Sequence, residues 1–208
     1  MIINPSDHNY TDVYKLLIGS IVPRPIGFIS TVDVNGYPNV APFSFFNGVC
    51  ANPPIVLFST VVRRDGTEKD TLRNVESTKE FVVNIVSEDF AEQMNLCSAD
   101  VPPDVDEFTL SGLTPIASDL VKCPRVKESR VTMECKLVNI IHFGQGPGSG
   151  NAVFGEVIRF HVADELFSNF RIDPDKLRAI GRMGGPTYVR TKDRFDMARP
   201  KTETMKSK

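Results

Sequence analysis

The sequence has no tryptophan, only three histidines and no long apolar run. Because a membrane-spanning helix needs about 20 mostly apolar residues, the last absence argues against a transmembrane segment. The N-terminus lacks the basic region of a secretory signal peptide, and Pro5 interrupts its short apolar start. A net charge of −2 provides no general field to attract nucleic acid. We therefore expect a cytoplasmic protein that binds neither membranes nor nucleic acid.

The four cysteines, Cys50, Cys97, Cys123 and Cys135, are widely spaced and include no Cys-x-x-Cys pair. This spacing argues against a zinc site and a redox dithiol, so we expect free thiols and no metal centre. No nucleophile with a base and an orienting partner can be assembled from the spacing of the other side chains. We therefore predict no catalytic side chain, which fits a protein whose chemistry comes from a cofactor.

Short apolar segments separated by turn residues make up most of the chain. Asn35-Gly36 predicts a tight hairpin between the first two strands, because both residues accept positive φ. Strands are expected at 21–34, 39–47, 55–60, 80–86, 131–143 and 152–162, and helices at 10–19, 70–76 and 88–96. Many strands with few helices predict a mainly β fold, a barrel with peripheral helices.

Finer expectations concern helix ends and chain segments. Asp70 and Ser87 are expected to cap the second and third helices. The first helix should pack through one face, since Val13, Leu16 and Leu17 recur at helical spacing. The segment 98–125 carries little periodicity and is expected to be irregular. No linker divides residues 1–190, which we predict to be one domain, whereas residues 191–208 form a polar and flexible tail.

A possible anion site begins at Lys69. The ammonium of Lys69 and the hydroxyl of Thr71 can reach the same anion, and the first turn of the helix adds free N–H groups with the positive end of a helix dipole. Asp70 would repel a phosphate, so its expected role is capping and orientation. Arg63 is a second candidate for a contact with a phosphate, or with the ribityl chain that joins a phosphate to a flavin ring. Alternatively, Lys69 and Arg63 are solvated residues at the surface.

Two paired strands offer a wall for a flavin ring. Alternation places Phe43 and Phe45 on one face and Phe46 on the other, so at least one of these rings belongs to the core. The stretch Ala41-Pro42-Phe43-Ser44-Phe45 is the expected backbone wall. Donors and acceptors for the polar edge of the ring and for the ribityl chain are Ser30, Thr31, Asn39, Ser44, Asn47 and Ser59. Asn84, on an otherwise apolar strand, is either a ligand contact or a structural hydrogen-bonding residue.

Seven motifs, in this order, resemble the flavin reductase-like family, which includes flavoredoxins and the reductase components of two-component monooxygenases. They are Arg24–Thr31, Asn39–Asn47, Lys69–Asn74, Glu80–Asn84, Glu107-Phe108 with Gly112–Pro115, Gly155–Val157 and Gly181–Tyr188. The resemblance implies an FMN-binding split β-barrel, with the FMN phosphate at Lys69-Asp70-Thr71 and Arg182 near the cofactor. It also implies a homodimer that uses NAD(P)H and serves free flavin or a partner monooxygenase.

One departure from this pattern leaves two alternatives open. Many members carry Gly-Asp-His about five residues before Gly-Glu-Val, where this chain has Gly148-Ser149-Gly150. The glycine string joins two predicted strands and opens no helix, so it does not indicate a Rossmann nucleotide site. The first alternative is a flavoredoxin-like electron carrier reduced by a protein donor. The second is a flavin-binding module without turnover.

Overall fold

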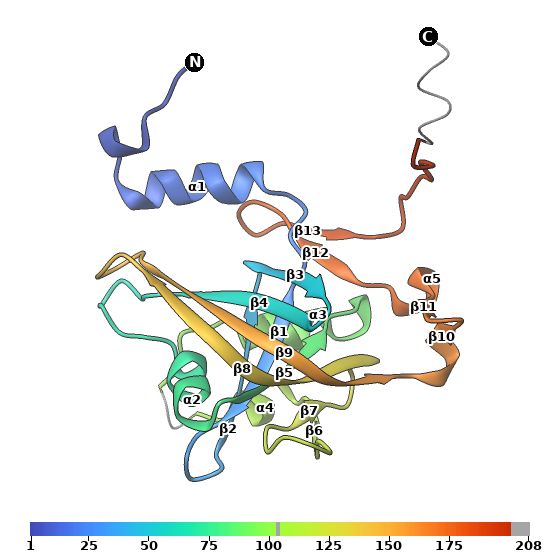
Figure 1. Ribbon diagram of the computed structural model, residues 1–208. Helices are drawn as coiled ribbons and strands as arrows, with labels where there is room; N and C mark the ends of the chain where they lie inside the picture. The colour runs from blue at the N-terminus through green and yellow to red at the C-terminus, as the bar shows by residue number, and fades with distance from the viewer. Residues whose placement is uncertain (103–104, 201–208) are drawn as a thin grey trace.

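A computed structural model describes residues 1–102 and 105–200 of the chain. At its centre, one antiparallel sheet of seven strands curls into a barrel (Figure 1). Along the sheet the order is β2-β1-β5-β8-β9-β4-β3. The strands are β1 (Gly27–Val32), β2 (Pro38–Phe43), β3 (Phe46–Ala51), β4 (Pro54–Val61), β5 (Glu80–Ile85), β8 (Val131–Phe143) and β9 (Gly150–Val162).

The hairpin between β1 and β2 forms where the sequence predicts it. Gly36 has a φ of 89°, and the carboxylate of Asp33 accepts hydrogen bonds from the backbone N–H groups of Asn35 and Tyr37, both at 2.8 Å. These bonds hold a turn that pairs the two strands over their whole length. The glycine-rich segment joins β8 to β9, also as predicted, and the ring of Tyr10 packs on Gly148 at its tip.

The barrel has an open seam at β2 and β3, the two edge strands of its sheet, where β2 comes next to β4. Strands β2 and β4 are in contact but form no ladder, because the chain leaves β2 at Ser44 and enters β3 at Phe46. Where they meet, the N–H of Ser59 donates to the carbonyl of Phe45 at 2.8 Å. The predicted fold class, a mainly β split barrel with peripheral helices, is confirmed. The single strand predicted over 39–47 is wrong, since two strands occupy this range.

This break changes the faces of the three phenylalanines. Phe43 and Phe46 both pack into the barrel core, whereas Phe45 faces Tyr14, with ring centroids 6.4 Å apart. The strict alternation expected from one continuous strand therefore fails at Ser44. In the core, Gly155 makes room for Phe81, because a Cβ at Gly155 would lie 2.2 Å from its ring.

Two hydrophobic clusters of buried side chains support the site. One fills the barrel and reaches α2 (Asp70–Thr78) through Leu72 and Val75. The other lies under η2 (Glu88–Phe90), α3 (Ala91–Leu96) and α4 (Glu107–Ser111), with Phe28, Phe90 and Phe108 at its centre. Both clusters include residues of the barrel strands, so α2, α3 and α4 are anchored against the barrel wall.

The two expected helix caps are wrong. The residue before α2 is Lys69, which makes no capping bond, and Asp70 is the first helical residue with its carboxylate turned to Arg63 and Arg73. The hydroxyl of Ser87 makes no capping bond either. The residues that follow Ser87 form the short 3-10 helix η2. The carboxylate of Asp70 thus pairs with two arginines and does not cap the helix.

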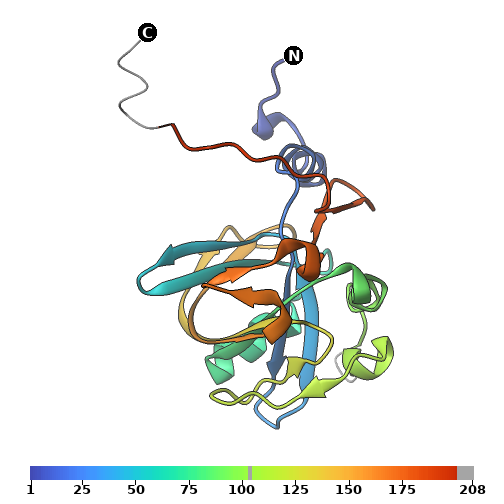
Figure 2. The same cartoon turned by 90° about the vertical axis from the view of Figure 1, so that its right-hand side faces the viewer.

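Helix α1 (Tyr10–Ser20) forms as predicted, but none of its residues is buried, so the expected packed face is wrong. Figures 1 and 2 show α1 outside the barrel and next to the hairpin of β12 (Ile180–Arg182) and β13 (Tyr188–Arg190). A Cβ on Gly184 of this hairpin would lie 3.6 Å from Gly19 of α1. The two segments therefore meet at one end of the barrel, although they lie far apart in the sequence.

The remaining elements are short. The predicted irregular segment contains α4, β6 (Pro115–Ile116) and β7 (Arg125–Val126). The other short elements are η1 (Pro5–Asp7), η3 (Asp164–Leu166), β10 (Phe167–Ser168), β11 (Arg171–Ile172) and α5 (Pro174–Leu177). Residues 191–200 form no helix or strand, and 201–208 of the predicted tail lie outside the described residues. Among the described helices, none is long and apolar enough to span a bilayer.

Candidate functional site

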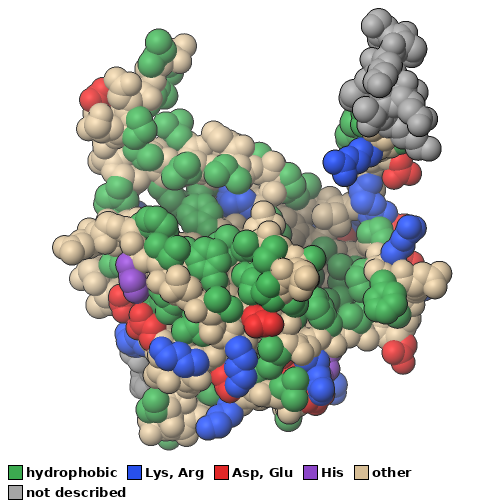
Figure 3. Space-filling model, in the orientation of Figure 1, with side chains coloured by type: hydrophobic (Ala, Val, Ile, Leu, Met, Phe, Trp, Pro, Cys, Tyr) green, Lys and Arg blue, Asp and Glu red, His purple; other side chains and the backbone are tan. Residues whose placement is uncertain are grey.

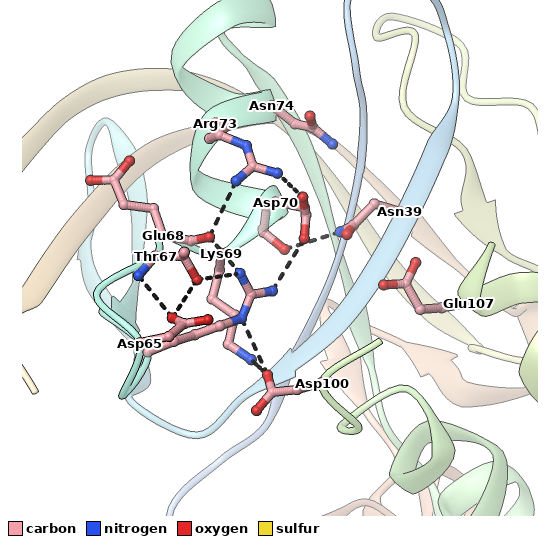
Figure 4. A network of polar contacts seen from close by, with 12 residues as sticks. Asn39, Asp65, Thr67, Glu68, Lys69, Asp70, Arg73, Asn74, Asp100 and Glu107 are labelled. Carbon is pink, nitrogen blue, oxygen red and sulfur yellow. Dashed lines mark hydrogen bonds and ion pairs between the residues drawn. The ribbon is translucent and has the colours of Figure 1, made fainter. Parts of the chain in front are cut away.

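A cluster of charged side chains lies beside the seam, where the chain leaves β4 and enters α2 (Figure 4). We call it the Arg63–Lys69 cluster; it consists of Arg63, Lys69, Asp70, Arg73 and Asp100. Arg63 lies 3.2 Å from Asp70 and 3.3 Å from Asp100, and Nζ of Lys69 lies 2.6 Å from Asp100. The hydrogen bond from Lys69 holds the pKa of Asp100 below its usual value. Two cations from different parts of the loop thus converge on one carboxylate.

The start of α2 adds backbone donors to this cluster. The carbonyl of Lys69 accepts from the N–H groups of Leu72 and Arg73. The N–H groups of Asp70 and Thr71 find no acceptor in the part of the chain that the structure describes. First-turn amides and the helix dipole favour an anion at such a position. Arg63 and Lys69 are therefore brought together at the start of α2, whereas the side chain of Thr71 is buried there.

A buried amide network ties α2 to β1 and β2. Nδ2 of Asn39 donates to Oγ1 of Thr71 at 3.0 Å and lies 3.4 Å from Oγ1 of Thr31. Nδ2 of Asn74 donates to the same Thr31 oxygen at 3.1 Å. Thr71 accepts in this network and keeps its own hydroxyl proton for another acceptor. Asn39 thus holds the side chain of Thr71 in place, and Thr31 in turn contacts Asn39.

Ser30 and Asn84 are wholly enclosed, and their polar atoms have protein partners. Nδ2 of Asn84 donates to the carbonyl of Phe28 at 2.9 Å and to Ser30 at 3.1 Å, and Oδ1 accepts from the N–H of Val126 at 2.8 Å. The hydroxyl of Ser30 donates to the carbonyl of Pro124. Of the two roles open for Asn84, the geometry favours the structural one, because it fastens Val126, just after the 98–125 segment, to the barrel.

A pocket of about 160 Å³ lies at the end of β2, close to the start of β1. We call it the Arg182 pocket. Its walls include Pro42 of β2 and Ser44 just after β2, Met94 and Ser98 from the α3 region, and Arg182 and Tyr188 from the β12–β13 hairpin. Three predicted site residues, Pro42, Ser44 and Arg182, are thereby brought together from segments about 140 positions apart in the sequence.

The other predicted residues line the seam or its flanks. Ala41 is half-buried on β2, Phe43 is in the core, and Phe45 faces α1. Ser59 is half-buried on β4, and its hydroxyl lies 3.4 Å from the carbonyl of Thr60. Asn47 is exposed on β3 and accepts from the N–H of Gly48. Because its ring is in the core, Phe43 can contribute only backbone atoms to a ligand site, and the backbone wall over Ala41–Phe45 stays a prediction.

Sequence reasoning missed two residues that shape the site. Asp100 lies in the segment without periodicity, so no local pattern linked it to Lys69. Arg24 was part of a quoted motif, yet its role depends on contacts with α1, Ser44 and Met183 that only the fold brings together. An arginine between two prolines ahead of an apolar strand was the available signal.

A mainly β split barrel with a basic cluster beside its seam defines a class, the flavoproteins of the flavin reductase type. Comparison with family models identifies a flavin reductase like domain over residues 18–194. The chain belongs to the flavin reductase-like family, and the predicted resemblance is confirmed.

Individual proteins support this assignment. An uncharacterized protein of Aquifex aeolicus is 45% identical over 179 residues, which cover 86% of this chain and 89% of that protein. The structure of nitrilotriacetate monooxygenase component B from Bacillus cereus is 40% identical, with a TM-score of 0.90 and coverage of 95% and 98%. That of the 2-nitrobenzoate 2-nitroreductase NbaA from Pseudomonas fluorescens is 33% identical, with a TM-score of 0.88 and coverage of 97% and 98%.

The donor set of the Arg63–Lys69 cluster fits a phosphate monoester. A guanidinium, an ammonium and two backbone N–H groups are hydrogen-bond donors at the start of α2. The carboxylate of Asp100, bound by both cations, is an internal anion at the place where a phosphate would be bound. The residues present therefore fit the phosphate of the FMN that the sequence predicts.

Proposed function

We propose that this protein is an FMN-dependent flavin reductase that takes reducing equivalents from NADH or NADPH and passes them to free flavin or to a partner monooxygenase. The observation that carries the proposal is the Arg63–Lys69 cluster beside the seam of a flavin reductase-like barrel. Support for a monooxygenase partner comes from the 40% identity to a monooxygenase component B.

In this proposal each part of the site has one task. Arg63, Lys69 and the first turn of α2 bind the phosphate, and the hydroxyl of Thr71 donates a hydrogen bond to it. The isoalloxazine ring and the ribityl chain would be held by Ala41, Pro42, Phe43, Ser44, Phe45, Asn47 and Ser59. Ser30, Thr31, Asn39 and Asn84 position these elements from behind. One charged cluster suits FMN, whose phosphate is a single monoester, better than the diphosphate of FAD.

The flavin supplies the redox chemistry when it is bound, because it accepts a hydride from a nicotinamide and releases electrons one or two at a time. The protein contributes position and electrostatics. A donor nucleotide must reach the exposed side of the ring. No side chain needs to act as a nucleophile or a general base.

The reductase activity can be tested by mixing the FMN-loaded protein with NADH or NADPH in an anaerobic stopped-flow instrument. We expect the flavin absorbance to bleach within seconds with at least one of the two nucleotides, since hydride transfer to a correctly placed flavin needs no further group. Dithionite serves as the control for full reduction. If dithionite bleaches the flavin and neither nucleotide does, the reductase proposal is wrong. Bleaching by a reduced ferredoxin would then favour the flavoredoxin-like electron carrier. If no protein donor reduces the flavin either, the result would favour a flavin-binding module without turnover.

We further propose that the protein is a homodimer. The long hairpin of β8 and β9 exposes apolar side chains, among them Val138, Ile141, Phe143 and Phe160. Figure 3 shows hydrophobic side chains spread across the middle of this face of the molecule and up to α1. Contiguous apolar surface of this kind marks interfaces. A second copy would also cover α1, whose apolar residues no other element buries among the described residues.

The homodimer predicts a measurable mass. Light scattering after gel filtration should give twice the chain mass of 23.1 kDa. Phe143→Asp should shift the protein toward the monomer, because Phe143 is 59% exposed on the apolar face and a buried unpaired carboxylate is unfavourable. Val34→Asp, at the tip of the β1–β2 hairpin and 77% exposed, is the matched control and should leave the mass unchanged. A wild-type monomer would contradict the proposal.

The cytoplasm is the proposed compartment. Cys50, Cys97, Cys123 and Cys135 are all free thiols, and the last three are buried. Reduced cysteines are typical of proteins that function in a reducing compartment. Burial raises the pKa of Cys97 to about 11, so this thiol stays protonated and unreactive.

A further inference from the structure

Arg24 is a buried cation without a counter-charge in the described part of the chain. Only 3% of its surface is exposed. Its guanidinium donates to the carbonyls of Ile18, Ile21 and Met183 at 2.6, 2.8 and 2.9 Å, and Nε lies 3.2 Å from the hydroxyl of Ser44. All four acceptors are neutral. Buried charges in proteins are normally paired, so this arrangement leaves a positive potential at the end of β2.

Arg182 adds a second uncompensated charge at the same place. Its guanidinium lies 4.4 Å from the ring centre of Tyr188 and makes no side-chain hydrogen bond or ion pair with residues 1–102 or 105–200. Desolvation and the nearby charge of Arg182 lower the pKa of Arg24. In contrast, the neighbouring Arg178 and Arg190 are both paired with Glu88. Arg182 lines the pocket, whereas Arg24 is buried and reaches it only through Ser44. The two positive charges repel each other, and an anion bound beside Arg182 would reduce this repulsion.

The size and lining of the pocket restrict the anion. Its volume is about 160 Å³, and an apolar cavity of about 150 Å³ is enough for one benzene ring. Ile26, Met94 and Pro42 provide apolar contacts, while Ser44 and Arg182 provide donors. A whole dinucleotide is too large for this space, since sites for drug-sized ligands span roughly 300–1,000 Å³. Figure 3 shows a hollow beneath α1 with hydrophobic walls and basic atoms at its back.

We propose that the Arg182 pocket binds a monocyclic aromatic carboxylate beside the flavin. The ring packs against Ile26 and Met94, and the carboxylate receives two parallel N–H bonds from Arg182, with Ser44 as a further donor. Arg24 is a positioning residue: it holds Ser44 and the β12–β13 hairpin in place and adds its charge. The inference rests on the proposed function only in placing a flavin next to this ligand.

Benzoate and its neutral analogue benzamide are matched probes for this site. Isothermal titration of the FMN-loaded protein should show benzoate binding roughly tenfold to a hundredfold more tightly than benzamide, the contribution of one charge-assisted contact. Arg182→Gln should remove this difference, and Arg182→Lys, which keeps the charge but loses the two-pronged geometry, should retain part of it. Arg190→Gln, the matched control in the adjacent hairpin strand, should bind as wild type does. Thermal midpoints verify that each variant is folded.

Several outcomes would overturn the inference. Equal affinity for benzoate and benzamide, or no binding of either, shows that the pocket does not recognise a carboxylate. A loss of benzoate affinity that is the same in Arg182→Gln and Arg190→Gln shows an unspecific charge effect. If Arg182→Gln weakens FMN binding and leaves benzoate unaffected, its guanidinium serves the cofactor. Titration of the flavin-free protein separates the two proposals, because benzoate binding without any uptake of FMN contradicts only the proposed function.

Discussion

Replacing Lys69 by alanine should raise the dissociation constant for FMN roughly tenfold to hundredfold. Nζ of Lys69 is a charged donor at the Arg63–Lys69 cluster, and a hydrogen bond to a charged group contributes about 1.5–3 kcal/mol. Each 1.4 kcal/mol corresponds to about one factor of ten in affinity. The fold should remain intact, because Lys69 precedes α2 and packs into neither hydrophobic cluster. Fluorescence quenching of added FMN measures the change.

Two controls make this experiment specific for the phosphate. Riboflavin has no phosphate, so its affinity should hardly differ between wild type and Lys69→Ala. Asp100→Asn should act in the opposite direction and lower the dissociation constant for FMN, since the carboxylate that competes for Lys69 and Arg63 is then neutral. Equal losses for FMN and riboflavin, or no loss for either, would remove Lys69 from the phosphate site.

Much of the sheet could be predicted because its signals are local. Asn35-Gly36 accepts the turn conformation that a hairpin needs, and apolar runs such as Phe81–Val83 mark buried strands. The break at Ser44 could not be predicted. It separates β2 from β3, which lie at opposite edges of the sheet, and this placement depends on the whole fold. The exposure of α1 was missed for a related reason. The spacing of apolar residues shows which face of a helix is apolar. It does not show whether that face packs against the same chain or against another one.

Part of the candidate site could likewise be predicted from local sequence, and part of it depends on the fold. Lys69, Asp70 and Thr71 are adjacent in sequence at a helix start, so their grouping follows from local structure. A polar residue on a strand is ambiguous, because Asn84 offers the same atoms to a ligand or to Val126. The pairing of Lys69 with Asp100 spans 31 positions, and that of Arg24 with Met183 spans 159. Such contacts depend on the whole fold.

The largest effect on stability is expected at Glu134 of β8. Its side chain is completely buried, and its carboxylate accepts from the N–H groups of Asp119, Leu120 and Val121 at 2.9, 2.6 and 3.1 Å. Nε2 of His161 lies 2.6 Å from the same carboxylate. Glu134→Ala leaves these donors without their acceptor, and removing one partner from a buried charged network costs about 3–5 kcal/mol. Urea unfolding should show a loss of this size.

The pH dependence gives an independent test. Burial alone would raise the pKa of Glu134, but the hydrogen bonds from Asp119, His161 and Leu120 outweigh it and hold this pKa below the ordinary 4.5. A carboxylate with a lowered folded-state pKa stabilises the protein above its unfolded pKa, and this contribution is lost as the pH falls through the folded-state value. The free energy of unfolding of the wild type should therefore decrease on acidification below about pH 4.5, and Glu134→Ala should decrease less steeply.

An exposed glutamate supplies the matched comparison for Glu134. Glu165→Ala, in η3, should change the free energy of unfolding by no more than about 0.5 kcal/mol and leave the pH profile unaltered. If Glu134→Ala behaves like Glu165→Ala, the loop at Asp119–Val121 must satisfy its N–H groups in another way, with water replacing the carboxylate. If instead only Glu134→Ala loses both stability and acid sensitivity, one buried carboxylate holds this loop to the barrel. The loop lies in the same segment that Ser30 anchors through Pro124 behind the proposed flavin site, so loosening it should also weaken FMN binding.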